Sequence, residues 1–344
     1  TFYTPEVVIV FSDNGFGEIS RKMHRFVRDN IMQSEWKNKK RPILINSWEA
    51  AYFTFDDDQL IEMAKDASKL GIEMFVLDDG WFGHRDNDNS SLGDWYVNTN
   101  KIKKGLDNLA KGVNNLGMMF GLWFEPEMIS EDSDLFRSHP EYAMRIPGRD
   151  PILGRRQLVL DFTNTEVVDN IYGQMTKILD SANISYIKWD MNRHITDLFT
   201  FTLPSDRQGE IFHRYILNVY NLLERLRQRY PHLLIEGCSG GGGRFDLGML
   251  YYSPQFWTSD DTDPIERVKI QFGTSMIYPP SAMGAHVSVS PNHQTGRVTP
   301  FETRSIVAMS GTFGYELDTR KLSDEDRNKI IEQNSYFHKY YDII

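Results

Sequence analysis

From residue 42 onward, short apolar runs alternate with amphipathic stretches along the chain. The apolar runs span residues 42–48, 72–81, 117–127, 156–162, 184–190, 232–239, 254–261, 283–290 and 311–318. The stretches between them space their apolar residues as a helix does, which predicts helices over about 56–70, 104–116, 165–182, 208–229, 264–275, 301–310 and 323–340. Near-continuous apolar strands that alternate with helices are typical of a parallel sheet covered on both faces.

The carboxyl ends of these runs carry polar and potentially catalytic residues. They include Trp48-Glu49, Asp78-Asp79, Glu125, Glu127, Asp190, Cys238-Ser239 and Asp260-Asp261. In a (β/α)8 barrel such ends meet on one face, where the active site lies, whereas a doubly wound sheet uses one switch point and needs fewer of them. The sequence therefore predicts an α/β fold, the (β/α)8 TIM barrel. Nine runs are one too many, so we expect the run at 156–162 to be an extra strand in the loop after the third strand.

The first forty residues follow a different pattern. They hold one apolar run at 7–11, a turn, a predicted helix over about 18–32 and a polar linker at 37–42. We expect residues 1–40 to be an N-terminal remnant of a flanking domain with a linker helix, and residues 41–344 to form the catalytic barrel. Because the chain lacks an initiator Met and ends on "KYYDII", an excised or processed fragment is expected.

Composition narrows the class of partner. The 344 residues carry a net charge of −10, which argues against binding to nucleic acid or to an anionic membrane surface. No apolar run is long enough to span a membrane, and no signal peptide is visible. A single cysteine, Cys238, excludes an intrachain disulfide and favours a cytoplasmic location, with a cysteine-poor secreted protein left open. Aromatic residues, at 13%, fit either a large core or a sugar-binding site.

The run "YIKWDMNR" places charged residues in a strand that is otherwise buried. Because side chains alternate along a strand, Lys188 and Asp190 share the inward face, while Ile187 and Trp189 face the helices. The Lys188 ammonium, one pleat below, would favour the ionised form of Asp190. An anionic carboxylate at the top of a barrel suits a nucleophile or an electrostatic stabiliser, and a structural ion pair is the alternative.

A second carboxyl is expected at the end of the run "PQFWTSDD". Asp260 ends this strand, whereas Asp263 precedes Pro264 and the predicted helix, as a helix N-cap does. Two carboxyls on strand ends that face one pocket are what glycoside hydrolysis requires, one ionised and one protonated.

Three further groups of residues point to a hydroxyl-rich ligand. The adjacent Asp78 and Asp79 suit bidentate hydrogen bonds to hydroxyls, or a metal, although no clustered metal-binding motif is present. Trp48, Trp81 and Trp123 lie at or just beyond strand ends. The stretch "GCSGGGGRF" lacks the ending of a phosphate-binding loop, and its glycines are better explained by close approach of the backbone to a sugar.

Eight motifs in this order and spacing resemble one known family. They are "NSWEA", "LDDGWFG", "GLWFEPEMIS", "GRRQLVLDF", "KWDMNR", "EGCSGGGGRFD", "WTSDDTD" and "GYELD". Together, over about 46–318, they resemble the bacterial α-galactosidases of glycoside hydrolase family 36. The resemblance implies a retaining, double-displacement enzyme that acts on terminal α-linked galactose, as in melibiose, raffinose and stachyose, without a metal or other cofactor.

The resemblance also implies a role for each matching residue. Asp190 would be the nucleophile and Asp260 the acid/base, and Asp78 and Asp79 would hold the galactose 4- and 6-hydroxyls. The remaining hydroxyls and the pocket walls would be provided by Arg155, Lys188, Cys238, Gly240, Trp48 and Trp123.

The resemblance leaves other possibilities open. Family members usually carry a large β-sandwich before the barrel and a smaller β domain after it. The full-length form is expected to be a homo-oligomer, a tetramer in some members. An α-galactosyl transferase of the raffinose-synthase kind and an α-N-acetylgalactosaminidase share the same chemistry. A non-catalytic sugar-binding barrel and an inactive fragment are the remaining alternatives.

Overall fold

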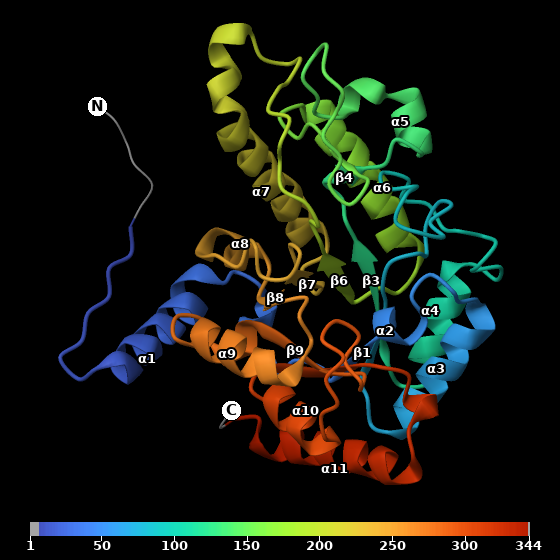
Figure 1. The fold of residues 1–344 in the computed structure, drawn as a ribbon, viewed down its shortest axis with the longest axis vertical. Helices are drawn as coiled ribbons and strands as arrows, with labels where there is room; N and C mark the ends of the chain where they lie inside the picture. Colours follow the sequence, from blue (N-terminus) through green and yellow to red (C-terminus); the bar gives the residue numbers. More distant parts are fainter. Residues whose placement is uncertain (1–6, 343–344) are drawn as a thin grey trace.

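The computed structural model describes residues 7–342 (Figure 1). The ends of the two predicted domains, residues 1–6 and 343–344, lie outside the described residues. Within 7–342, eight parallel strands form a closed barrel in the order β1-β10-β9-β8-β7-β6-β3-β2. Their bounds are β1 Leu44–Asn46, β2 Met74–Leu77, β3 Met119–Phe124, β6 Tyr186–Trp189, β7 Leu234–Gly237, β8 Gln255–Trp257, β9 Met283–Ser288 and β10 Thr312–Glu316. The predicted TIM barrel is confirmed.

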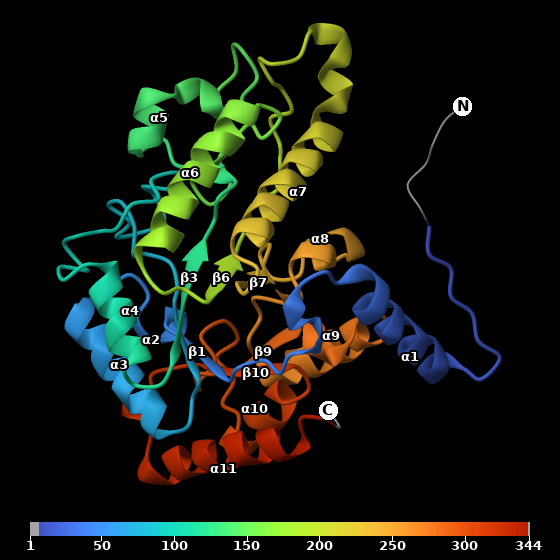
Figure 2. The ribbon, with the colours of Figure 1, turned by 180° about the vertical axis from the view of Figure 1, so that it is seen from behind.

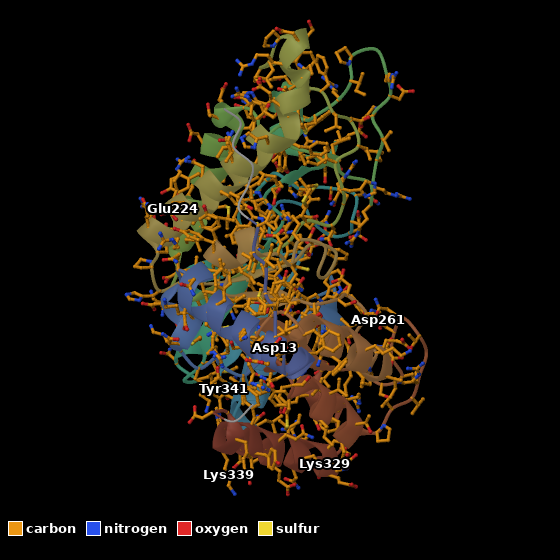
Figure 3. The ribbon with its side chains drawn as sticks, turned by 90° about the vertical axis from the view of Figure 1, so that its left-hand side faces the viewer. Asp13, Glu224, Asp261, Lys329, Lys339 and Tyr341 are labelled. Atoms are coloured by element: carbon orange, nitrogen blue, oxygen red, sulfur yellow. The ribbon has the colours of Figure 1, made fainter. Side chains whose placement is uncertain are left out.

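Helices surround this barrel. The α-helices that follow strands are α2 Trp48–Ala51, α3 Asp57–Lys69, α4 Leu106–Asn114, α6 Thr165–Ser181, α7 Ile211–Arg229, α8 Leu247–Tyr252, α9 Pro264–Ser275, α10 Phe301–Ala308 and α11 Asp324–Tyr340. The seven predicted helices all occur. Side chains cap several of them, as when Asp56 accepts a hydrogen bond from the Gln59 N–H at the start of α3. Charged residues of the outer helices, such as Glu224 of α7 and Lys339 of α11, lie at the edge of the molecule in Figure 3.

The run at 156–162 does not join the barrel. It supplies β5 Leu158–Val159, which pairs antiparallel with β4 Met128–Ile129 in a separate two-stranded sheet. This confirms the prediction of an extra strand after the third barrel strand. Strand β4 lies beside α6 in Figure 1. Helices α5 Asp134–Ser138, α6 and α7 lie on the side of the barrel away from α10 and α11 (Figure 2).

The described part of the N-terminal segment closes the bottom of the barrel. Helix α1 Phe16–Phe26 continues as a π-helical turn, η1 Val27–Ile31, where one helix was predicted. Trp36 then packs against side chains inside the barrel, and its indole N–H donates to the His232 carbonyl at 3.0 Å. The apolar run 7–11 lies outside any helix or strand, with most of its side chains exposed. The division into domains at residue 40 stays a prediction.

Short 3-10 turns join the remaining elements. They are η2 Glu35–Asn38, η3 Pro140–Tyr142, η4 Ser205–Glu210, η5 Pro280–Ala282 and η6 Thr319–Lys321.

The side-chain alternation predicted for β6 is present. Ile187 and Trp189 belong to the main core beneath the helices, and Tyr186 belongs to a smaller cluster inside the barrel. Lys188 and Asp190, on the Tyr186 side, therefore project toward the carboxyl-terminal mouth of the barrel.

Candidate active site

A polar pocket of about 160 Å³ opens at the carboxyl ends of the barrel strands. Loops from all around the barrel contribute to it, as expected for this fold. Its lining residues are Trp48, Glu49, Asp78, Asp79, Trp123, Arg155, Lys188, Asp190, Asn192, Trp257, Asp260, Thr262, His293, Gln294 and Glu316. Eight of the ten residues predicted for the site thus come together in one pocket.

Asp190, directly after β6, is held by three hydrogen-bond donors. Its Oδ2 accepts from the Trp123 indole N–H at 3.1 Å and from the Asn192 amide at 2.8 Å, and its Oδ1 accepts from the Met191 N–H at 2.8 Å. The side chain is buried. Donors on both oxygens stabilise the charged form of a carboxylate and fix its orientation.

Lys188, expected to favour the ionised form of Asp190 from one pleat below, does not contact Asp190 directly. Its ammonium donates instead to Asp78 Oδ2 at 3.2 Å, because its long side chain reaches across the barrel interior from β6 toward the end of β2. Burial alone would lower the pKa of Lys188, but the negative charge of Asp78, aided by Glu316 and Asp190, raises it well above its ordinary value. The ammonium is thus a permanent charge that acts on Asp190 only through space.

Asp260, beyond the end of β8, has different surroundings. The Cys238 thiol is 3.9 Å from its Oδ1. The side chain of Asp260 is exposed toward the pocket, yet partial desolvation by the surrounding protein atoms and the negative charge of Asp190 raise its pKa to about 6. Asp190 and Asp260 thus have different surroundings, because donors fix the first carboxylate while the pKa of the second is raised. Two carboxyl groups in different environments can divide into a base or nucleophile and an acid.

Asp78 and Asp79 each have a cationic partner, so they are ordered although they are adjacent. Asp78 accepts from the Asn46 amide at 2.6 Å and from Lys188. Asp79 forms a two-pronged ion pair with Arg85, at 2.9 Å from Nη2 and 3.0 Å from Nε. Burial raises the pKa of Asp79, and Arg85 opposes this shift. Both carboxylates are presented to the pocket in fixed orientations.

Three residues singled out from the sequence lie outside the pocket lining. Cys238 is buried behind Asp260, and Gly240 lines a neighbouring hollow bounded by Asn192 and Phe212. Trp81 is fully buried and packs edge-on against Phe82 and Phe124, so it belongs to the core.

Seven residues that line the pocket were given no role from the sequence. The sequence features that could have assigned them to the site differ from residue to residue. Glu49 is one of the strand-end residues named above, and Glu316 is the last residue of β10. Both lie within the quoted motifs, as Asn192 does, so their positions could have assigned them to the site. His293 and Gln294 lie on the long irregular loop after β9, which has no periodic pattern and no strand end to place it. The others are Trp257 and Thr262.

Glu125 connects two parts of the site from behind the pocket. One of its oxygens, Oε1, accepts both the Asn192 backbone N–H at 2.5 Å and the Gln157 amide at 2.7 Å. Asn192 in turn holds Asp190, and Gln157 belongs to the turn that carries Arg155. Burial, followed by the negative charge of Asp190, raises the pKa of Glu125 to about 8.

This raised pKa predicts a pH-dependent stability. Between the ordinary value of 4.5 and about 8, the unfolded chain loses the Glu125 proton while the folded chain keeps it, so the free energy of unfolding falls as pH rises. Glu125→Gln has no proton to lose and retains an acceptor for both donors. In thermal unfolding between about pH 5 and pH 8, we expect the Tm of this variant minus that of the wild type to increase by a few degrees. Parallel Tm curves for the two proteins over this range would contradict the prediction.

Two negative findings apply to residues 7–342. No group of three or more His, Cys, Asp or Glu side chains is arranged there to hold a metal ion. No helix in this range combines the length and the apolar character needed to cross a membrane.

Comparison with known proteins identifies the family. Residues 1–344 match the protein family described as Melibiase. The chain belongs to the melibiase family. The family resemblance drawn from the motifs is thereby confirmed.

The chain is similar to several bacterial α-galactosidases. The chain is 55% identical to Alpha-galactosidase Mel36A of Lactobacillus acidophilus over 99% of its length, and 52% identical to Alpha-galactosidase AgaA of Geobacillus stearothermophilus over 98%. These matches cover 47% and 46% of the two relatives, so the chain spans about half the length of the curated relatives it matches.

Solved structures show the same architecture. The crystal structure of GH36 AgaA from Geobacillus stearothermophilus aligns with a TM-score of 0.95 at 51% identity, over 96% of this chain and 46% of that one. The galactosidase domain of AgaSK aligns with a TM-score of 0.92 at 54% identity, over 96% of this chain and 45% of that one. Variants of AgaA have been solved in complex with raffinose and with stachyose.

Proposed function

We propose that this chain is the catalytic domain of a retaining α-galactosidase that releases terminal α-linked galactose from oligosaccharides such as melibiose and raffinose. The main support is the pair of carboxyl groups in one pocket, Asp190 fixed by three donors and Asp260 with a pKa of about 6. The names of the relatives agree with this chemistry, and AgaA variants bind raffinose and stachyose.

In the proposed reaction, Asp190 attacks the anomeric carbon while Asp260 donates its proton to the leaving glycosidic oxygen. This forms a covalent galactosyl–enzyme and releases the rest of the oligosaccharide. Asp260, now ionised, takes a proton from water, which attacks the same carbon and frees Asp190. Two inversions retain the α configuration, and retaining enzymes of this kind place the two carboxyl groups about 5–5.5 Å apart.

The surroundings of Asp190 suit this role. The Trp123 and Asn192 donors hold the oxygen Oδ2, and the Met191 N–H holds Oδ1. These contacts orient the carboxylate before substrate arrives, which reduces the reorganisation needed in the transition state.

Selectivity for galactose is assigned to Asp78 and Asp79. Their pairing with Lys188 and Arg85 fixes the two carboxylates, and each retains acceptor capacity for sugar hydroxyls. Because the 4-hydroxyl is axial in galactose and equatorial in glucose, fixed acceptors reject the wrong epimer by leaving buried polar groups unpaired. Trp48, Trp123 and Arg155, which line the same pocket, complete the proposed sugar site.

We further propose residues 41–344 as the catalytic unit. The segment before it supplies Trp36, which packs against the bottom of the barrel, far along the strands from the pocket. The proposed role of this segment is to support the barrel.

The proposed function predicts a strong preference among aryl α-glycosides. We expect kcat/KM for an aryl α-galactoside to exceed that for the matching α-glucoside by about 10⁴-fold, the scale reached when a site is built to bind a particular hydroxyl. The matching α-N-acetylgalactosaminide tests whether the pocket accepts an acetamido group at the 2-position. Equal rates for galactoside and glucoside, or a preference for the N-acetyl sugar, would overturn this assignment.

A further inference from the structure

Arg267, in the first turns of α9, reaches back to the segment that carries Asp260. Its side chain is buried, with 3% of the residue exposed. Arg267 Nη2 donates to the Ser259 carbonyl at 2.7 Å, and its Nε donates to the Asp261 carbonyl at 2.7 Å. The guanidinium therefore holds the backbone carbonyls of the two residues next to Asp260 in sequence. We propose that Arg267 is the positioning residue that holds Asp260 where it can protonate the leaving group, an inference that rests on the proposed function.

The guanidinium is itself firmly anchored. Its Nη1 donates to the Gly284 carbonyl of β9 at 3.1 Å and to the Thr258 hydroxyl. Its plane lies over the Trp257 ring, 4.2 Å from the centroid. Because Trp257 and Asp260 both line the pocket, Arg267 connects the wall and floor of the pocket to the barrel strands beneath.

The glycine loop after β7 also approaches the same segment closely. Gly241 has a φ of +88°, and a Cβ added to it would lie 2.7 Å from the Asp260 backbone nitrogen and from Ser259 Cα. Such a contact leaves no room for displacement toward the loop. The backbone of the Asp260 segment thus lies in close contact with the Gly241 backbone and is also held by two hydrogen bonds from Arg267.

Arginine is suited to this position in a way that lysine is not. Its planar fork directs separate N–H groups to two carbonyls, whereas an ammonium on a flexible stem makes one point contact. Arg267→Lys would keep the positive charge and most of the volume but release one of the two carbonyls that flank Asp260. A displacement of about 1 Å at a reacting group can cost about 10²-fold in rate.

The test compares substrates that differ in their need for a proton. An aryl α-galactoside with 2,4-dinitrophenolate as leaving group departs without protonation, whereas methyl α-galactoside requires it. We expect Arg267→Lys, in the natural full-length protein, to lower kcat/KM for the methyl glycoside at least about tenfold more than for the activated aryl glycoside. This ratio reports on acid catalysis and does not change when only the amount of folded protein falls.

Arg41→Lys provides a matched control. Arg41 is as buried as Arg267, and it donates to Gln255 Oε1 at 2.9 Å and to the Pro254 carbonyl at 3.3 Å. These contacts lie at the opposite end of the same strand, β8, away from the pocket. The control is expected to lower Tm while leaving the ratio of the two kcat/KM values unchanged.

Each outcome shows whether Arg267 positions Asp260 for catalysis or only stabilises the fold. If Arg267→Lys lowers kcat/KM equally for both substrates, or leaves their ratio unchanged as Arg41→Lys is expected to do, the inference is wrong. Arg267→Gln, which keeps a donor for one carbonyl, is measured beside it, and if neither variant folds while Arg41→Lys does, the role is structural only. Asp260→Ala serves as the reference. If that variant shows no selective loss for the methyl glycoside, the proposed acid/base assignment is wrong, whatever Arg267 does.

Discussion

Replacing Asp190 with alanine will reduce kcat for an aryl α-galactoside by at least about 10⁴-fold, the scale of loss when a covalent nucleophile is removed. The remaining groups of the pocket bind the sugar but cannot form the galactosyl–enzyme. The shorter alanine side chain leaves space below the anomeric carbon. This space lies close to Trp123 and Asn192, the two side chains that donate hydrogen bonds to Asp190 in the wild type. Added azide can occupy this space and attack the activated aryl substrate, and a single inversion then gives the β-galactosyl azide.

Product configuration and a matched variant make this prediction specific. Asp197 is also buried, lies on the same loop after β6, and caps the Ile152 N–H at 2.9 Å outside the pocket. Asp197→Ala is expected to retain turnover within about tenfold of the wild type and to form no azide adduct. Substantial turnover by Asp190→Ala without azide, or an α-configured azide product, would exclude Asp190 as the nucleophile.

Much of the fold was predictable because the pattern of apolar residues along the chain reflects which faces of the strands and helices are buried. The parallel strands are covered on both faces, so each appears in the sequence as a continuous apolar run, and each run ends where the barrel opens to solvent. The run at 156–162 carries the same apolar signal as a barrel strand. Only the count of nine runs, one more than the barrel needs, set it apart from the barrel strands. The apolar pattern shows that a strand is buried but does not show which sheet it joins.

The site was predictable to the extent that strand ends specify it. Asp78, Asp190 and Asp260 follow barrel strands, and closure of the barrel brings them into one pocket. Contacts that depend on the reach of a side chain across the barrel could not be predicted in this way. Lys188 contacts Asp78 on another strand instead of Asp190 on its own, because alternation gives the direction of a side chain but not its end point.

Irregular loops account for the rest of the difference. The loop that brings His293 into the pocket has neither a helical nor a strand period, and its course depends on tertiary contacts such as the Asn292 amide that donates to Thr262 Oγ1 at 3.0 Å. Trp81 shows the converse error. A strand-end tryptophan looked available for ligand, but the loops that fold over it bury it completely.

Asp260→Ala will lower kcat/KM far more for a substrate with a poor leaving group than for one with a good leaving group. It will also change the pH profile of kcat/KM. The pKa of Asp260, about 6, means that its acidic form declines as pH rises through this value. In the wild type, kcat/KM for methyl α-galactoside should therefore fall above about pH 6, and in the variant this basic limb should disappear because no proton donor remains. The loss at pH 5 should be about 10²–10⁴-fold for the methyl glycoside and much smaller for the dinitrophenyl glycoside.

The adjacent Asp261 provides the control for this prediction. Its side chain accepts the Asp263 N–H at 2.9 Å and is not part of the pocket lining, and it is labelled in Figure 3. Asp261→Ala should keep both the ratio of the two kcat/KM values and the basic limb of the pH profile.

Azide should accelerate kcat of Asp260→Ala on the dinitrophenyl substrate, because an anion attacks the galactosyl–enzyme without a general base. The product should be the α-galactosyl azide. If Asp260→Ala keeps the wild-type basic limb, the proton comes from another group, and the difference in surroundings between Asp190 and Asp260 does not divide their roles.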